Sequence, residues 1–353
     1  MIPSACIGEL FVLGFQGTVV PRWLRDFAAR YGLGGVILFD YDVQTRRYER
    51  NVKSPDQVRR LCAEVAALPT RPLIFVDQEG GKVCRLKKSR GFAPLPSAWA
   101  FNRLPPATKA ALARQSYAEL RALGISYNLA PVIDLNLNPD NPDIGAVERA
   151  YSAEPAEVRA NVAILGEAAR AAGLGLCLKH YPGLGGAAVN SHEALTDLSH
   201  TLDDAQLALF DELAPALPGQ AILVSHGMVA QWEPGRPVSM SARALGALRG
   251  RRPEVLLISD DLQMQGLQRV LSTQEACVQG IQAGLDVLLI GNNLLDETAL
   301  AASFAEALAR AAEADCGLAR QVCAALTRVR ARKRQYCTQP ATNRRTRRTL
   351  KGL

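Results

Sequence analysis

The sequence predicts an α/β fold in which one (β/α)₈ barrel of the TIM type takes up most of the chain. Three observations support this: eight apolar, β-rich runs recur along 353 residues, helix-like segments separate them, and polar residues follow the ends of the runs. Eight alternations of strand and helix predict a parallel sheet, and closure into a barrel is the simplest architecture for that count. A doubly wound open sheet is the alternative, but its GxGxxG signature is missing after the first run.

The predicted strands are almost continuously hydrophobic, which is typical of strands buried on both faces. They span residues 7–15, 34–39, 72–77, 127–135, 174–180, 221–226, 254–260 and 286–291. Predicted helices lie between them at 21–32, 54–68, 107–123, 155–172, 203–215, 241–249 and 273–283, with more than one helix in 295–334. Ser54 precedes Pro55, so we expect it to cap the second helix. No repeat or linker divides the chain, which predicts a single domain over residues 1–335.

The formal net charge of +7 is concentrated near the end of the sequence. Ten basic residues and no acidic ones lie between Arg328 and Lys351, and subtracting them leaves 7 − 10 = −3 for the rest. Residues 336–353 contain little that could be buried, so we predict a basic, disordered tail. A solvated tail explains this charge better than a nucleic-acid groove, although contact with nucleic acid or an anionic surface is the alternative.

The eight cysteines are scattered, and none forms a CxxC pair or a zinc-binding spacing. This pattern predicts reduced, structural thiols in a cytoplasmic protein. The first residues lack the features of a signal peptide. No apolar run reaches the roughly 18–20 residues that a membrane span needs. The sequence does not determine the oligomeric state, and a monomer is expected.

In a (β/α)₈ barrel, catalytic residues lie at the carboxyl ends of the strands and in the loops that follow. Here Asp77 ends the third predicted strand, Lys179 and His180 end the fifth, and Asp260 ends the seventh. A partly screened carboxylate such as Asp260 can act as a nucleophile, a base or a metal ligand. Capping of the next segment is an equally good explanation for Asp260, and Asp261 competes for the same role.

Charged residues near these ends suit a ligand rich in hydroxyl groups, because each OH needs a partner once water is expelled. The residues are Asp77, Glu79, Lys82, Arg85, Arg149, Lys179 and His180. A phosphate would also fit such a set, but no P-loop is present. Taken singly, each charge could equally be a solvated loop residue.

The stretch "KHYPGLGGAAVNSH" ends in His192, on a glycine-rich loop that can move. A neutral imidazole can donate or accept a proton near neutral pH, usually beside a carboxylate that orients it. Asn190 stands two residues earlier and is neutral. A surface histidine is the alternative interpretation. Metal binding by His180, His192 and His226 is a weaker hypothesis because the spacing fits no zinc motif.

Several motifs occur together and in order: "VDQEGGKVCRL", "APVIDLNLNPDNPDIG", "KHYPG", "SHGMV" and "ISDDLQM". In this combination the chain resembles glycoside hydrolase family 3, specifically the single-domain β-N-acetylglucosaminidases of bacterial cell-wall recycling. The resemblance covers about residues 7–335. It implies a barrel fold and a retaining, two-step mechanism without a metal or organic cofactor, acting on a small GlcNAc-containing carbohydrate such as a muropeptide.

The resemblance also implies a role for each matching residue. Asp260 matches the nucleophile that forms a glycosyl-enzyme, and His192 matches an acid/base histidine on a mobile loop, in place of the usual second carboxylate. The matching sugar contacts are Asp77, Arg85, Arg149, Lys179 and His180. His226 matches a family histidine near the site, and we predict that it also contacts the substrate.

Two positions depart from the family pattern. Leu184 stands where the family has histidine, and Asn190 stands where it has the aspartate partner of the catalytic histidine. An amide can orient the ring but cannot stabilise imidazolium by charge. In a serine-protease triad, changing the aspartate to asparagine costs about 10⁴-fold in rate. Here we expect a smaller loss of about 10²-fold.

Three functions therefore remain open. The first is an exo-acting β-N-acetylglucosaminidase. The second is a phosphorylase or transglycosylase, because an anionic acceptor would meet less repulsion without a carboxylate beside His192. The third is a weakened, non-catalytic paralogue that binds amino sugars.

Overall fold

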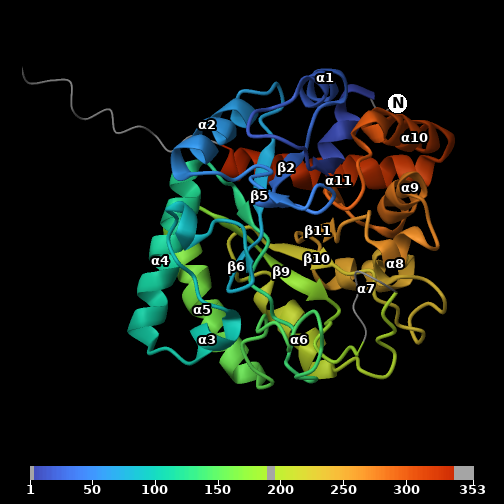
Figure 1. The fold of residues 1–353 in the computed structure, drawn as a ribbon. Coiled ribbons are helices and arrows are strands. Elements are labelled where there is room, and N and C mark those ends of the chain that lie inside the picture. Colours follow the sequence, from blue (N-terminus) through green and yellow to red (C-terminus); the bar gives the residue numbers. More distant parts are fainter. Residues whose placement is uncertain (1–3, 189–194, 338–353) are drawn as a thin grey trace, which may run out of the picture.

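The computed structural model describes residues 4–188 and 195–337. Eight parallel strands form one sheet in the order β11-β10-β9-β8-β5-β2-β1-β12. Helices surround the strands (Figure 1). A parallel bridge joins Ile258 to Val287, and the Ser259 N–H donates to the Val287 carbonyl at 2.9 Å, so the two edge strands meet. The predicted barrel is confirmed.

The barrel strands are β1 (Phe11–Leu13), β2 (Gly35–Leu38), β5 (Leu73–Val76), β8 (Tyr127–Asn128), β9 (Gly175–Tyr181), β10 (Ala221–Val224), β11 (Leu256–Ser259) and β12 (Leu288–Ile290). Two hairpins project beyond them, β3 (Tyr41–Asp42) with β4 (Arg47–Tyr48), and β6 (Gln78–Gly80) with β7 (Val83–Cys84). All eight predicted strands exist, whereas sequence analysis did not predict the hairpins.

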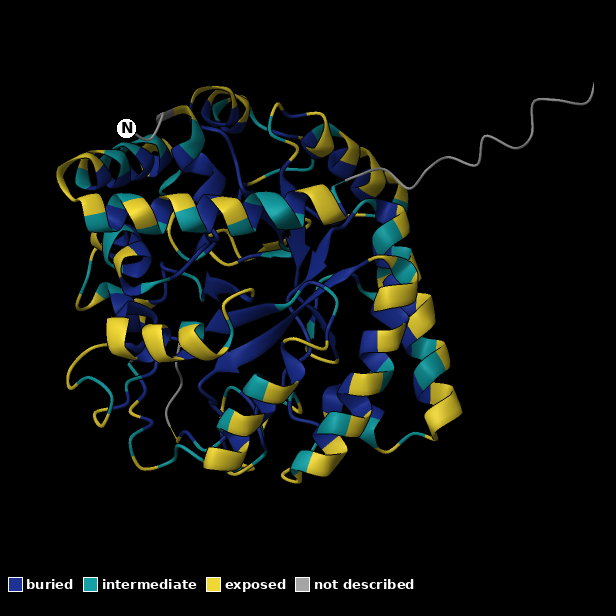
Figure 2. Ribbon diagram, turned by 180° about the vertical axis from the view of Figure 1, so that it is seen from behind, coloured by how far each residue is buried: buried dark blue, intermediate teal, exposed yellow. Residues whose placement is uncertain are grey.

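The helices are α1 (Arg22–Tyr31), α2 (Pro55–Ala66), α3 (Ala98–Asn102), α4 (Pro106–Leu123), α5 (Pro155–Ala172), α6 (Asp204–Leu213), α7 (Ala242–Arg251), α8 (Gln265–Gln268), α9 (Thr273–Ala283), α10 (Ala301–Ala314) and α11 (Cys316–Tyr336). Figure 2 shows that the helices around the sheet expose one side and bury the side that faces the strands. Ser54 caps α2 as predicted, accepting a hydrogen bond from the Gln57 N–H.

Two predicted strands are shorter than expected. The first run begins as a 3₁₀ helix, η1 (Ser4–Leu10), which packs against α1, α10 and α11. An apolar run buried by helices looks like an apolar run buried in a sheet, so sequence alone did not separate them. In 127–135 only Tyr127–Asn128 pair as a strand. Pro131 follows closely, and its nitrogen cannot donate to a sheet ladder.

The basic residues of α11 take part in the fold, in contrast to the prediction that the positive charge from Arg328 onward belongs to a tail. At the amino end of the barrel, which we call the base, Lys333 Nζ lies 2.8 Å from Glu9 Oε2, and Arg330 lies 2.7 Å from Glu9 Oε1. Residue 336, the first of the predicted tail, is the last residue of this helix. The tail itself stays a prediction because residues 338–353 lie outside the described residues.

The eight cysteines all lie within the described residues and are free thiols, as predicted. Among those residues, no helix is both long and apolar enough to cross a membrane.

Candidate active site

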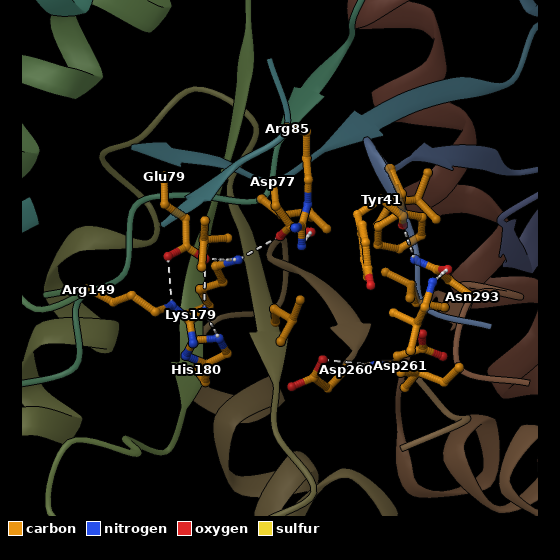
Figure 3. Close-up of a pocket in the computed structure, with 18 of the residues that line it drawn as sticks. Tyr41, Asp77, Glu79, Arg85, Arg149, Lys179, His180, Asp260, Asp261 and Asn293 are labelled. Carbon is orange, nitrogen blue, oxygen red and sulfur yellow. Dashed lines mark hydrogen bonds and ion pairs between the residues drawn. The ribbon is translucent and has the colours of Figure 1, made fainter. Parts of the chain in front are cut away.

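A pocket of about 240 Å³ opens at the carboxyl end of the barrel, which we call the mouth. Its walls come from residues that follow the strands, among them Asp77 after β5, Lys179 and His180 in β9, and Asp260 after β11. In Figure 3, Glu79, Arg149, Lys179 and His180 gather on one side of this space, Tyr41 and Asn293 lie on the other, and Asp260 lies between them. The structure therefore brings together most of the predicted site residues.

An ionic network forms one wall of the pocket. Lys179 Nζ lies 2.7 Å from Asp77 Oδ1 and 2.6 Å from Glu79 Oε1. Arg149 donates two hydrogen bonds of 2.8 Å to the same Glu79, one from Nε and one from a terminal NH₂ group. Lys179 and Glu79 are buried, with side chains 3% and 4% exposed. Two carboxylates therefore hold the lysine ammonium, and two cations hold Glu79.

In this network, burial and the neighbouring charges shift the pKa values in opposite directions, and the charges have the larger effect. Burial by itself would raise the pKa of Asp77, but the positive charges of Lys179 and Arg85 lower it below its usual value. The pKa of Glu79 is likewise lowered, because Arg149 and Lys179 outweigh its burial. The pKa of Lys179 is raised by Asp77 and Glu79 against the effect of burial. These side chains therefore stay ionised near neutral pH.

His180 is held as one tautomer by two neighbours, one that only accepts hydrogen bonds and one that only donates them. Its Nδ1 lies 2.7 Å from Asp134 Oδ2, and its Nε2 lies 3.0 Å from an NH₂ group of Arg149. A carboxylate only accepts and a guanidinium only donates. The imidazole therefore carries its proton on Nδ1 and accepts from Arg149 at Nε2. Asp134, which is fully buried, also accepts from the backbone N–H groups of His180 and Leu184.

Arg85 extends the network toward the rim. Its guanidinium lies 3.4 Å from Asp77 Oδ2 and 3.8 Å from Asp40 Oδ1, while Lys87 Nζ lies 2.6 Å from Asp40 Oδ2. We call the whole set the mouth network: four cations, four carboxylates and one neutral histidine. Its members are Asp40, Asp77, Glu79, Arg85, Lys87, Asp134, Arg149, Lys179 and His180. Its charges balance within the protein.

Asp260 and Asp261 lie together at the end of β11, and both line the pocket. Asp260 Oδ1 accepts from the Asp261 backbone N–H at 2.8 Å. Asp261 Oδ1 accepts from the backbone N–H groups of Gln263 at 3.1 Å and Gly291 at 3.2 Å. Burial raises the pKa of Asp261 to about 7, with a smaller contribution from the nearby Asp260. The N-cap of the short helix that follows is Met264, so Asp260 does not fill the capping role left open by the sequence.

His226 does not line the pocket in the described part of the chain. Its Nε2 lies 3.1 Å from the Asp261 carbonyl oxygen, and its Nδ1 lies 2.7 Å from Ser239 Oγ. The structure therefore places His226 beneath the peptide that carries the two aspartates.

Asn190 and His192 lie outside the described residues, so their predicted roles stay predictions. The chain on both sides of them is anchored near the pocket. On one side, the Leu184 N–H donates to Asp134 at 2.8 Å, and Leu184 lines the pocket. On the other, Met228, which follows β10, accepts from the Leu198 N–H and donates to the Thr196 carbonyl, each at 2.8 Å.

Glu79 and Asp134 belong to the mouth network. Sequence analysis named Glu79 only as one of the charged residues near the strand ends, and it gave Asp134 no role. Glu79 stands two residues after Asp77, and the alternation of side chains in extended backbone would have suggested that both face one side. Asp134 lay inside a predicted strand, where its charge alone was a signal, because a buried carboxylate needs partners. The described residues include no group of three or more His, Cys, Asp or Glu side chains that could hold a metal ion.

The wall opposite the mouth network is held in place by Asn293. Its side-chain oxygen accepts from the Val43 N–H at 2.8 Å, and its NH₂ group donates to the Tyr41 carbonyl at 2.9 Å. This amide fastens the β3–β4 hairpin to the loop after β12. The pocket therefore has an ionic side and a side with Tyr41, Val43 and other apolar groups.

A barrel with a carboxylate and a charge-balanced polar wall at its mouth suits a ligand rich in hydroxyl groups, and comparison with known proteins identifies the family. The Glycosyl hydrolase family 3 N terminal domain matches residues 8–330, and the chain belongs to this family of glycoside hydrolases. It is 32% identical over 299 residues to a beta-hexosaminidase of Pseudomonas aeruginosa, covering 82% of this chain and 85% of that protein. A beta-hexosaminidase of Methylococcus capsulatus is 33% identical over 281 residues, 76% and 78% of the two chains.

Solved structures show the same similarity. The beta-N-acetylhexosaminidase of Beutenbergia cavernae has a TM-score of 0.81 and 28% identity, covering 94% of this chain and 98% of that one. A family 3 beta-N-acetylglucosaminidase from a Paenibacillus strain has a TM-score of 0.85 and 28% identity over 97% of this chain. The present chain spans 64% of that longer protein.

Proposed function

We propose that the protein is a retaining exo-β-N-acetylhexosaminidase that removes a terminal GlcNAc from peptidoglycan fragments, with Asp260 as nucleophile and His192 as acid/base. One observation carries this proposal: Asp260 lines the same pocket as a polar wall that neutralises its own charges. The similar proteins named beta-hexosaminidase support the choice of sugar.

The size of the pocket favours cleavage at the end of a sugar chain. A volume of about 240 Å³ is smaller than the roughly 300–1,000 Å³ of pockets for drug-sized ligands. It suits one terminal sugar residue better than a segment of an extended chain. The mouth network offers that sugar charged donors and acceptors at fixed positions, so its hydroxyl groups find partners without a net charge being buried with it.

The proposed reaction has two steps. In the first, an Asp260 oxygen forms a bond to the anomeric carbon while the glycosidic C–O bond breaks, and the departing oxygen takes a proton from His192. In the second, His192 takes a proton from water as the water oxygen bonds to the anomeric carbon, and the Asp260–carbon bond breaks. One water molecule is consumed, and both side chains return to their starting states.

The other carboxyl groups of the pocket are poorly suited to attack carbon. Asp77 and Glu79 are held in ion pairs with Lys179 and Arg149, and their lowered pKa values make them weaker nucleophiles. Asp261, whose pKa is raised to about 7, holds its carboxyl toward backbone N–H groups. Asp260 is therefore the carboxylate that we assign to the nucleophilic role, in agreement with the family motif.

Hydrolysis fits the site better than phosphorolysis. A phosphate acceptor would need cations whose charge is still available, but Arg85, Lys87, Arg149 and Lys179 each lie within 4 Å of a carboxylate. Binding phosphate would therefore mean breaking existing ion pairs. We propose water as the acceptor.

The proposal includes a rate below that of an enzyme with an aspartate at position 190. Asn190 can hold the His192 ring but adds no negative charge beside imidazolium, so we expect activity about 10²-fold lower than the site could reach. A paralogue that binds amino sugars without turnover is the competing hypothesis. A monomer in the cytoplasm, with residues 1–335 as the catalytic domain, completes the proposal, and the free thiols support that location.

The test is release of p-nitrophenol from p-nitrophenyl N-acetyl-β-glucosaminide by the purified protein, with the Asp260→Ala variant as control. We expect measurable release by the wild-type protein and none above background by the variant. Equal rates for the two proteins would refute the proposal, as would saturable GlcNAc binding without any release. Formation of GlcNAc-1-phosphate in phosphate buffer would instead show a phosphorylase.

A further inference from the structure

His226 is one of the four histidines in the sequence, and it contacts the backbone of Asp261, the residue after Asp260, without lining the pocket. It is buried, with 4% of its surface exposed, and Ser239 beside it is fully buried. A buried polar side chain needs hydrogen-bond partners, and here both ring nitrogens have one. The question is what the protein gains from holding an imidazole at this place.

The partners determine the protonation form of the ring. The Asp261 carbonyl oxygen, 3.1 Å from Nε2, can only accept. The proton therefore sits on Nε2, and Nδ1 accepts from the Ser239 hydroxyl at 2.7 Å. The Asp261 carbonyl thus selects the tautomer, because a hydroxyl can either donate or accept. Ser239 completes the arrangement by donating to Nδ1.

Asp261 is held at both its backbone and its side chain. His226 fixes its carbonyl, while the N–H groups of Gln263 and Gly291 fix its carboxyl group. The remaining backbone polar group of Asp261, its N–H, donates to Asp260 Oδ1 at 2.8 Å. The direction of that N–H depends on the orientation of residue 261. The hydrogen bonds that hold Asp261 therefore also determine where one oxygen of Asp260 lies.

We propose that His226, which donates from Nε2 to the Asp261 carbonyl and accepts at Nδ1 from Ser239, is a positioning residue for the nucleophile Asp260 and acts through the Asp261 backbone. The inference rests on the proposed function, in which Asp260 attacks the sugar. It differs from the sugar contact predicted for His226 from sequence, because the ring nitrogens are directed at protein groups. A shift of the reacting group by about 1 Å can cost about 10²-fold in rate.

The test compares His226→Leu, which removes both hydrogen bonds, with His226→Gln, whose amide can donate to Asp261 and accept from Ser239. The matched control is His200→Leu, the same change at an exposed histidine. Two substrates are used, N-acetyl-β-glucosaminides of p-nitrophenol and of the better leaving group 2,4-dinitrophenol. Inhibition by free GlcNAc measures how well the sugar is held.

We expect His226→Leu to lower kcat by about 10²-fold on both substrates, with KM and GlcNAc inhibition within about twofold of wild type. His226→Gln should recover most of that loss, and His200→Leu should match wild type. Ser239→Ala should lower kcat by about fivefold, the effect of one neutral hydrogen bond. This last variant keeps the test decisive if His226→Leu does not fold, as judged by its melting curve.

Four results would overturn the inference: unchanged kcat in the leucine variant, a rise in KM or in the GlcNAc inhibition constant without a fall in kcat, a loss confined to the poorer leaving group, or a folded glutamine variant no better than leucine. The second would mean a sugar contact, and the third a role in proton transfer. Failure of the proposed function looks different, because the wild-type protein would then release neither phenol.

Discussion

The barrel buries charged clusters at both ends, and the two differ in what surrounds them. At the base, Glu9 is held by Arg330 and Lys333, and the Lys333 Nζ also donates to the Leu33 carbonyl at 2.9 Å. At the mouth, Lys179 is held by Asp77 and Glu79. Both clusters pair opposite charges at similar distances, yet only the mouth cluster lies beside a carboxylate assigned to chemistry.

The base cluster joins two distant parts of the chain, because Glu9 belongs to η1 and its cations to α11. Its role is explained by closing the ring of helices around the barrel. The mouth network instead gathers side chains from several strand ends around a pocket. Glu9, Arg330 and Lys333 at the base also line a cavity. Buried charge beside a cavity therefore does not by itself identify a functional site; a reactive group beside the charges is also needed.

The largest expected effect comes from Lys179→Met, which removes the cation between two carboxylates. We expect kcat/KM to fall by about 10³-fold, equivalent to about 4 kcal/mol of transition-state stabilisation, because Asp77 and Glu79 would repel each other and lose their positions. Steady-state kinetics on p-nitrophenyl N-acetyl-β-glucosaminide measures the loss. Lys333→Met is the matched change at the base, and its folded fraction should keep wild-type kcat/KM. A similar loss of kcat/KM in both variants would contradict the claim that only the mouth network serves catalysis.

Glu9→Gln tests the base cluster by removing its carboxylate, whereas Lys333→Met removes one of its cations. It leaves Arg330 and Lys333 without their carboxylate, and one of them is buried, so the free energy of unfolding should fall by about 3 kcal/mol. Urea unfolding followed by fluorescence measures this change. The kcat of the folded variant should stay within about twofold of wild type. Unchanged stability, or a loss of kcat without a loss of stability, would contradict the assignment.

Asn190→Asp sharpens the account of the mouth, because it adds charge where the family has aspartate. If His192 is the acid/base, the new carboxylate should stabilise its imidazolium and raise kcat by about 10²-fold. The melting temperature should change little. Kinetics of the two proteins side by side decides the matter, and an unchanged or lower kcat would mean that another group supplies the proton.

The smallest expected effect, taken per pH unit, is the pH dependence of the free energy of unfolding, which should have opposite signs for the groups at the two ends. The pKa of Glu9 is lowered because its hydrogen bonds to Arg330 and Lys333 outweigh burial, so its contribution to stability is lost as the pH falls. The pKa of Asp261 is raised to about 7 by burial, so its contribution is present in acid and lost as the pH rises from about 4 to about 7.

Asp261→Asn should therefore flatten the fall in unfolding free energy between pH 4 and 7, by up to about 1.4 kcal/mol per pH unit. Urea unfolding at pH 5, 6 and 7 gives the slopes for wild type and variant, with Glu9→Gln as the comparison at the base. Parallel slopes for wild type and Asp261→Asn would show that the carboxyl of Asp261 does not titrate in this range.

The barrel was predictable because each buried strand is a short apolar run with helix signals on both sides. The places of Asp77, Lys179 and Asp260 at the pocket were predictable because each lies at or just after the end of a strand, whereas their roles stay predictions. The predictions that failed concern segments whose structure depends on tertiary contacts. The run at 7–10 is buried by helices and not by a sheet, and Pro131 interrupts the fourth run.

The basic residues of α11 show that sequence analysis has the same limit for charged residues. By composition the end of the chain resembles a solvated basic tail, yet Arg328 lies 2.7 Å from Asp286 and Lys333 is buried against Glu9. Their partners are far away in sequence, so only the fold brings them together. Sequence likewise placed His226 near the site, but it did not show that the ring is directed at Ser239 and the Asp261 carbonyl.

The central claim is that Asp260 forms a covalent bond to the sugar. It can be tested by incubating the protein with a fluoride-activated N-acetylglucosaminyl donor whose glycosyl-enzyme breaks down slowly, followed by proteolysis and mass spectrometry. The account predicts one added N-acetylglucosaminyl group, located on Asp260 and absent from Asp260→Ala. A label on Asp77, Glu79 or Asp261, or turnover of the donor without any label on the protein, would contradict it.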